Sequence, residues 1–143
     1  MNTDYRAYLA PFGRLLLIAV FLLSGLSKIG NPSGTIAYIG STGAPLPVVG
    51  YALSVAIEVG VSLLLLLGYK TRAAATILAL FCVATALLFH SNLADQNQMI
   101  HFMKNMAMAG GLLQLVAFGA GAISIDNRHH RDRARTGDVS LAD

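Results

Sequence analysis

Glu58 is the residue of this sequence with the clearest potential for chemistry, because it lies in the middle of a long apolar stretch. The stretch covers about residues 46–67 and contains no other charged side chain. An ionisable group in such a stretch usually faces the interior of a helix bundle or a wet cavity, where it can handle protons or bind a ligand. A structural ion pair, or a protonated and hydrogen-bonded carboxyl group, explains Glu58 equally well. Helical spacing predicts one inward-facing polar stripe on this segment: Tyr51, Ser54, Glu58 and Ser62.

Two cations in the preceding apolar stretch are candidate partners for this carboxylate. Arg14 and Lys28 lie on one helical face, which also carries three uncharged residues: Ile18, Phe21 and Gly25. We expect Arg14 to be the better partner, because a guanidinium group can bind both oxygens of a carboxylate. Lys28 either pairs with Glu58 or extends its ammonium group to the nearest lipid headgroups.

A second polar group surrounds the loop between the last two apolar stretches. Its members are His90, Asp95, Gln96, Gln98, His101, Lys104 and Asn105. Histidine titrates near neutrality and can pass protons, but these two histidines lack the short i, i+4 spacing of a helical metal site. We therefore predict no metal site, retain His90 and Lys104 as ligand-binding candidates, and place His101 in the loop. Asn105 either hydrogen-bonds to neighbouring groups of the chain or binds a carbonyl oxygen of a ligand.

The amino-acid composition of the chain is typical of a membrane protein rather than of a water-soluble one. Its 143 residues are 55% hydrophobic and only 12% charged, with a mean hydropathy of +0.63, whereas soluble domains carry about a quarter of charged residues. A short chain cannot hide this apolar excess in a core, so a soluble globule, a disordered chain and a nucleic-acid-binding protein are all disfavoured. Cys82 is the single cysteine, which excludes an internal disulfide and a dithiol redox pair.

Four apolar stretches are long enough to cross the hydrocarbon core of a bilayer, which takes about 20 helical residues. We predict spans at about residues 12–29, 46–67, 73–89 and 103–123. The segment GYKT joins the second and third spans, so these two should form an antiparallel hairpin. The predicted fold is an all-α, four-helix transmembrane bundle in a single domain over residues 1–127. We expect residues 128–143 to form a basic, disordered tail.

Basic residues indicate the orientation in the membrane. Of the 10 Lys and Arg residues, only Lys28 and Lys104 fall on the side of the first and third loops. The remainder lie at the two ends of the chain and in the second loop: Arg6, Arg14, Lys70, Arg72, Arg128, Arg131, Arg133 and Arg135. Because cytoplasmic loops are enriched in Lys and Arg, we predict that both termini are cytoplasmic. The basic tail is then a contact for anionic lipid headgroups or for a soluble partner.

Several short stretches, in this order and spacing, resemble one protein family. They are FLLSGLSK (residues 21–28), LGYKTR (67–72), LLFH (87–90), FMKNMAMAGGLL (102–113) and GAGAISID (119–126), together with Arg14 and Glu58. Over about residues 12–126 the chain resembles the DoxX-like membrane proteins. The resemblance implies a four-helix bundle in the bacterial cytoplasmic membrane. It also implies that six residues fall at the family's recurrent polar positions: Arg14, Lys28, Glu58, His90, Lys104 and Asn105.

The same resemblance implies a role beside quinone-linked membrane oxidoreductases or redox-stress systems. We expect an accessory subunit that binds a small apolar ligand such as quinone, without a covalent link, and that meets membrane lipid and an oxidoreductase partner subunit. Lys28, His90 or Asn105 would hydrogen-bond to a quinone oxygen, and Glu58 would exchange protons. The chain supplies no redox group, so it is not expected to be catalytic by itself. The alternatives are a non-catalytic membrane assembly or chaperone subunit and a small-solute or proton permeation protein, and self-association of the chain is a further option.

Overall fold

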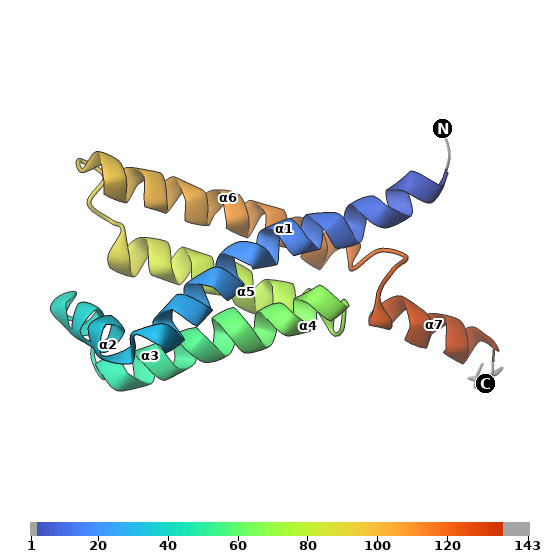
Figure 1. Cartoon of the computed structure of the whole chain (residues 1–143). Helices are drawn as coiled ribbons and strands as arrows, with labels where there is room; N and C mark the ends of the chain where they lie inside the picture. Colours follow the sequence, from blue (N-terminus) through green and yellow to red (C-terminus); the bar gives the residue numbers. More distant parts are fainter. Residues whose placement is uncertain (1–2, 136–143) are drawn as a thin grey trace, which may run out of the picture.

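A computed structural model describes residues 3–135, and every element within these residues is helical. Figure 1 shows the long helices side by side, with α2 at one end of the assembly and α7 at the other. In chain order the elements are α1 (Thr3–Gly30), α2 (Pro32–Ser41), α3 (Pro47–Val55), a π-helical segment η1 (Ala56–Val61), α4 (Ser62–Leu67), α5 (Thr71–Phe89), α6 (Gln96–Phe118) and α7 (Ile125–Arg135). The all-α prediction is confirmed for the described part of the chain.

Three of the described helical stretches are long and apolar enough to cross a membrane. They are Ala7–Gly30, Pro47–Leu67 and Thr71–Phe89, and they agree with the first three predicted spans. The second stretch joins α3, η1 and α4 into one continuous helix. α6 is 23 residues long but is not among the three, because the polar side chains of its first half lower its mean hydropathy.

The predicted fourth span, about residues 103–123, overlaps α6 but does not share its ends, since the helix covers Gln96–Phe118. Asp95 caps the start of the helix: its Oδ1 accepts the backbone N–H of Gln98 at 2.9 Å. Gly119 ends the helix with a φ of 78°, in a region that favours glycine. His101 consequently lies inside α6 and not in the loop where we expected it.

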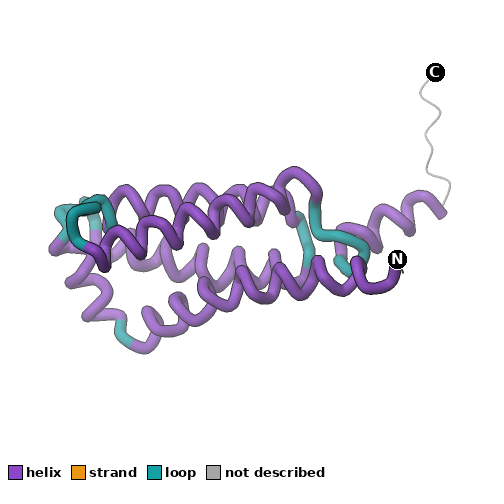
Figure 2. Tube along the Cα trace, turned by 90° about the horizontal axis from the view of Figure 1, so that it is seen from above, coloured by secondary structure: helices purple, strands orange, loops and turns teal. Residues whose placement is uncertain are grey.

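The turn between α4 and α5 makes the predicted antiparallel hairpin. Gly68 follows the last residue of α4 with a φ of 64°, which closes the helix in the left-handed conformation that glycine adopts without cost. Two residues later, Lys70 is also left-handed, with a φ of 47°. The chain thereby reverses within three residues and α5 packs back along α4 (Figure 2).

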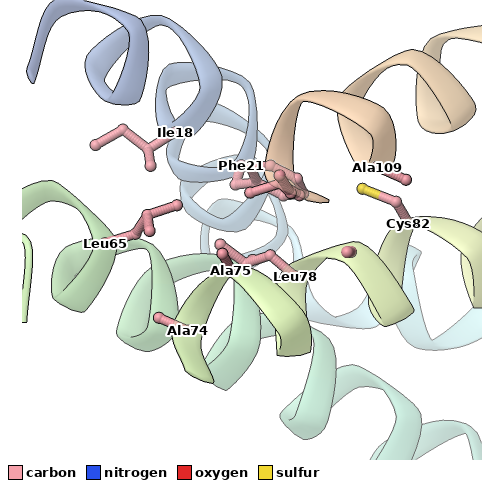
Figure 3. Close-up of a cluster of buried hydrophobic side chains, with 10 residues drawn as sticks. Ile18, Phe21, Leu65, Ala74, Ala75, Leu78, Cys82 and Ala109 are labelled. Carbon is pink, nitrogen blue, oxygen red and sulfur yellow. The ribbon is translucent and has the colours of Figure 1, made fainter. Parts of the chain in front are cut away.

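The core lies where α1, α4, α5 and α6 meet, as Figure 3 shows. Ile18, Leu65, Leu78 and Leu112 are fully buried there. The α5 face is built mainly from small side chains, among them Ala74, Ala75, Ala79 and Cys82. Small residues let membrane helices approach closely, which explains the extensive packing of α5 on α6. This core occupies the half of the assembly nearer to α7 and leaves the other half open for a cavity.

The segment after α6 is tied to the α4–α5 turn by its own backbone and by Asp126. The two carboxylate oxygens of Asp126 accept the backbone N–H groups of Lys70 and Thr71 at 2.8 and 2.9 Å. The N–H of Asp126 donates to the carbonyl oxygen of Gly68 at 2.9 Å. Partial burial opposes ionisation of the carboxyl group, but these backbone hydrogen bonds outweigh it and lower the pKa of Asp126.

This attachment starts a helix in a stretch where we expected disorder. α7 covers Ile125–Arg135 and therefore includes the first part of the predicted tail. Forming the first turn of a helix is unfavourable, because several residues are ordered before the first hydrogen bond forms. The hydrogen bonds of Asp126 hold the first turn of α7 in place and offset part of this free energy. The remainder of the predicted tail, residues 136–143, lies outside the described residues.

Candidate functional site

Glu58 lies within the π-helical segment η1 in the middle of the second span. Its side chain is only 5% exposed. Ser54 and Ser62, four residues before and after it, are buried as well, so the predicted inward polar stripe is confirmed at these three positions. A π segment interrupts the regular hydrogen-bond ladder of a helix and occurs frequently at functional sites.

Lys28 of α1 is the cation that pairs with Glu58. Its Nζ lies 2.7 Å from Oε2 and 2.9 Å from Oε1 of the carboxylate. Ser24, one helical turn before Lys28, accepts a third hydrogen bond from Nζ at 2.7 Å and donates its own hydroxyl to Glu58 Oε1 at 3.1 Å. The three donor hydrogens of the ammonium group are thus all used inside this cluster, and an ionised carboxylate is satisfied without water.

Lys28 can reach Glu58 because α1 and η1 approach each other closely. Gly25 of α1 faces η1, and a Cβ atom at this position would lie 2.7 Å from Val59 Cγ2 and 3.1 Å from Glu58 Cβ. Any larger residue would therefore push the helices apart. Gly25 is one of the few positions in this chain where the absence of a side chain sets the geometry of the site.

Arg14 does not bind Glu58, and our expectation that it would be the better partner is wrong. Arg14 is 2% exposed, and its guanidinium group binds backbone carbonyl oxygens instead: Leu65 at 3.2 Å, Leu66 at 3.4 Å and Ile123 at 2.6 Å. The last carbonyl groups of a helix have no partner within it, and Arg14 satisfies two of them at the end of α4. It also holds the segment that leads to α7, through the carbonyl oxygen of Ile123.

A cavity of about 860 Å³ opens beside the Lys28–Glu58 pair. It lies between α1, α2 and α3 on one side and α5 and α6 on the other, in the half of the assembly that carries α2. We call it the central cavity. Its wall is mainly apolar and includes Phe21, Leu53, Ile57, Phe81, Leu88 and Met108. A volume in this range and an apolar wall with a few polar groups are typical of small-molecule sites.

The central cavity brings together five of the six residues that we singled out. Lys28, Glu58, His90, Lys104 and Asn105 all line it, whereas Arg14 does not. Four of the five already have partners in the chain. His90 Nδ1 lies 2.8 Å from Gln98 Oε1. Asn105 donates to the carbonyl oxygen of His101 at 3.0 Å and accepts the hydroxyl of Thr85 at 3.2 Å, and Lys28 is bound to Glu58.

Lys104 is the exception. It is exposed and lines the cavity, and it has no hydrogen-bond acceptor or carboxylate partner among residues 3–135. Its neighbours at this end of the cavity are the stacked imidazole rings of His90 and His101, whose centroids are 4.9 Å apart. A ligand in the central cavity would therefore meet one ammonium group with free donors and, further along, a carboxylate that is already paired.

The sequence did not single out Ser24 and Tyr38 as site residues, although both line the cavity. Ser24 precedes Lys28 by four residues, a spacing that places both on one helical face, so this signal was present. Tyr38 of α2 stacks on Phe89 of α5 with ring centroids 5.9 Å apart. Nothing in the sequence brings these two rings together, because their contact depends on how α2 folds back over the cavity.

Taken together, the apolar helices, the buried ion pair within them and the apolar cavity define an integral membrane protein with a candidate small-molecule site. A family model described as DoxX matches residues 9–91, which is more than half of the chain. The inner membrane protein YphA of Escherichia coli (strain K12) is 34% identical over 128 residues, covering 86% of this chain and 91% of YphA. The inner membrane protein YqjF of the same organism is 40% identical over 115 residues, covering 79% and 85%.

The chain therefore belongs to the DoxX family, and the resemblance seen in the sequence is confirmed. No solved structure matches it.

Proposed function

We propose that this DoxX protein is an accessory subunit of a quinone-linked oxidoreductase or redox-stress system in the bacterial inner membrane, and that it holds a quinone in the central cavity. In this proposal α6 serves as the fourth membrane span of a four-helix bundle, with both termini in the cytoplasm. The inner-membrane names of YphA and YqjF support the location. The central cavity is the observation on which the ligand proposal rests.

The chemistry of the cavity suits a flat apolar ring with acceptor oxygens. The aromatic and aliphatic wall provides contact area for the ring, and a carbonyl oxygen accepts hydrogen bonds but donates none. Lys104 is then the residue that binds a quinone oxygen, because its ammonium group has no acceptor among the described residues. Lys28, which we considered first for this role, has its donors directed at Glu58 and Ser24.

Glu58 is the proposed proton-handling group, since among the described residues it is the one acidic residue that lines the central cavity. Electrons must come from a partner subunit. Cys82 is buried and is the only cysteine of the chain, so no second thiol is available for a dithiol reaction within this subunit. The isolated protein is accordingly proposed to bind its ligand without turning it over.

Quinone binding by the purified protein tests this proposal. Protein in nanodiscs is titrated with a quinone and binding is followed by extraction and chromatography. Lys104→Gln should weaken binding by about ten-fold, which is the loss of one charge-assisted hydrogen bond. Lys70→Gln, the same change at the opposite end of the molecule, should bind like the unmodified protein. Absence of saturable quinone binding in the unmodified protein contradicts the proposal and favours the assembly-subunit alternative.

A further inference from the structure

A second cavity, of about 480 Å³, lies at the other end of the helix assembly. It is formed by the start of α5, the segment that follows α6, and the first part of α7. Three basic side chains line it: Lys70, Arg72 and His130. We call it the basic cavity. It shares no residue with the central cavity and has no part in the proposed binding of quinone.

Within residues 3–135, no carboxylate forms an ion pair with Lys70 or Arg72 in the basic cavity. In the part of the chain that the structure describes, Asp126 is the one acidic residue that lines the cavity. Both of its carboxylate oxygens already accept backbone N–H groups, those of Lys70 and Thr71. The ammonium group of Lys70 lies over the ring of Tyr69, 5.8 Å from the centroid. An anionic group entering the cavity would therefore meet two available cations.

The position of the basic cavity matches the boundary between headgroups and hydrocarbon. α5 is a membrane-length apolar helix that starts at Thr71, so Lys70 and Arg72 lie at the level where the apolar part of the membrane ends. The same cavity is lined by Phe118, which is 79% exposed, and by Ala73. A ligand here would contact cations at one end and apolar side chains at the other.

We propose that the basic cavity binds the headgroup of an anionic phospholipid. Its phosphodiester oxygens would accept hydrogen bonds from Lys70 and Arg72, and the upper part of an acyl chain would lie against Phe118. Arginine and lysine are the usual partners of phosphate oxygens. The apolar side of the cavity favours a lipid over a soluble phosphate, because a free phosphate ion has nothing to place against Phe118 and Ala73.

Basic residues near a membrane also attract anionic lipids without any defined site, and the experiment must separate the two cases. Protein is purified in detergent, and phosphatidylglycerol or phosphatidylcholine is added in increasing amounts. Bound lipid is counted by native mass spectrometry. We expect one saturable phosphatidylglycerol, with phosphatidylcholine bound at least about ten-fold more weakly. The double variant Lys70→Gln/Arg72→Gln should lose most of this preference.

The matched control is Arg128→Gln/Arg131→Gln, which removes the same charge from exposed positions of α7 that do not line the cavity. It should retain the bound phosphatidylglycerol. Equal losses in the two double variants would show diffuse attraction and overturn the proposal. Displacement of the lipid by millimolar inorganic phosphate would also overturn it, since the site would then recognise the free ion.

A second variant guards against a general loss of structure in the charge variants. Ala73→Trp, at an exposed position of α5 that lines the cavity, fills space without changing charge. It should reduce phosphatidylglycerol retention while the thermal unfolding midpoint of the protein stays close to that of the unmodified chain. Retention of the lipid by a folded Ala73→Trp variant would contradict a site in this cavity.

Discussion

Ser24, Lys28 and Glu58 show how a carboxylate is kept inside an apolar helix. Removing water from a charged group costs several kcal/mol, and a partner offsets this only when the hydrogen-bond geometry is good. Lys28 contacts both carboxylate oxygens and Ser24 supplies a further hydrogen bond. The cluster leaves no carboxylate oxygen of Glu58 without a donor.

A double-mutant cycle on this pair should therefore be strongly non-additive. Lys28→Met and Glu58→Leu each leave one charge without its partner, and each should lower the free energy of unfolding by about 3 kcal/mol. The double variant Lys28→Met/Glu58→Leu replaces the pair with apolar side chains and should be more stable than either single variant. Unfolding in detergent, followed by circular dichroism, measures the three differences. Additive losses would mean that the two charges do not stabilise each other.

At the residue scale, the sequence predicted which side chains face inward better than it predicted which side chains they bind. Helical spacing correctly placed Glu58 and its neighbouring serines on a buried face. The preference for Arg14 over Lys28 failed because it considered only how well a guanidinium group fits a carboxylate. The competing acceptors, the terminal carbonyl groups of α4 and that of Ile123, become visible only when the helix ends are placed in space.

At the scale of elements, the contact between α1 and η1 depends on Gly25. Gly25→Ala should separate the two helices, strain the Lys28–Glu58 contact and lower the thermal unfolding midpoint, because the added Cβ would lie within 2.7 Å of Val59 Cγ2. Gly13→Ala is the control on the same helix, since a Cβ there meets no atom within 4 Å. It should be neutral or slightly stabilising, as alanine is the better helix former. Similar behaviour of both variants would argue against close packing at Gly25.

The attachment of α7 gives a prediction about pH. Asp126→Ala removes the acceptor for two backbone N–H groups and should destabilise the protein by about 1–2 kcal/mol at neutral pH, as loss of a helix cap does. The pKa of Asp126 is lowered in the folded state, so its contribution is complete above the unfolded pKa of about 4 and is lost as pH falls through the folded value. The stability difference between the two proteins should shrink below pH of about 4. A difference that is independent of pH would contradict the role of the ionised carboxylate.

The bounds of the elements were predictable where their signals are local. Asp95 followed three residues later by Gln98 is a recognised helix start, and it marks the beginning of α6 more accurately than hydropathy does. α2 likewise begins at Asn31 and Pro32, where the side chain of Asn31 accepts the N–H of Gly34 at 3.1 Å. α7 also has a local signal, because Ser124 precedes it and its Oγ accepts the backbone N–H of Asn127 at 3.2 Å. The attachment of α7 to the α4–α5 turn has no local signal, because it depends on residues more than fifty positions earlier in the chain.

At the scale of the whole molecule, the two cavities lie at opposite ends and have different chemistry. The core between them combines large buried side chains, such as Ile18, Leu65 and Leu112, with the small side chains of α5. The end that carries α2 is therefore proposed to hold a ligand, while the end that carries α7 is proposed to contact lipid. Composition alone predicted a membrane protein. It could not predict that the central cavity occupies one half of the helix assembly while the core fills the other. That division depends on how the helices pack in three dimensions.

Two adjacent leucines test whether a ligand occupies the central cavity. Leu87 and Leu88 of α5 are 58% and 63% exposed, but only Leu88 lines the cavity. Leu88→Trp should weaken quinone binding in nanodiscs by about ten-fold by filling part of the cavity, whereas Leu87→Trp should leave it unchanged. Equal binding by the two variants would place the ligand elsewhere. Thermal unfolding of both variants shows whether each remains folded.

The π segment η1 has a consequence for the rotational phase of the second span. Its hydrogen bonds close over one residue more than those of an α-helix. Compared with a regular α-helix of the same length, α3 is therefore turned relative to α4 by the rotation of one residue, roughly 100°. Deletion of Gly60, where an added Cβ would meet no atom within 4 Å, would let the segment close as a regular helix. Ser54 and Leu65, both buried in the structure, would keep their present relative orientation. A regular α-helix over the undeleted segment would instead change that orientation by roughly 100°. The π segment thus absorbs one residue locally and leaves the two halves of the span in phase with their separate neighbours.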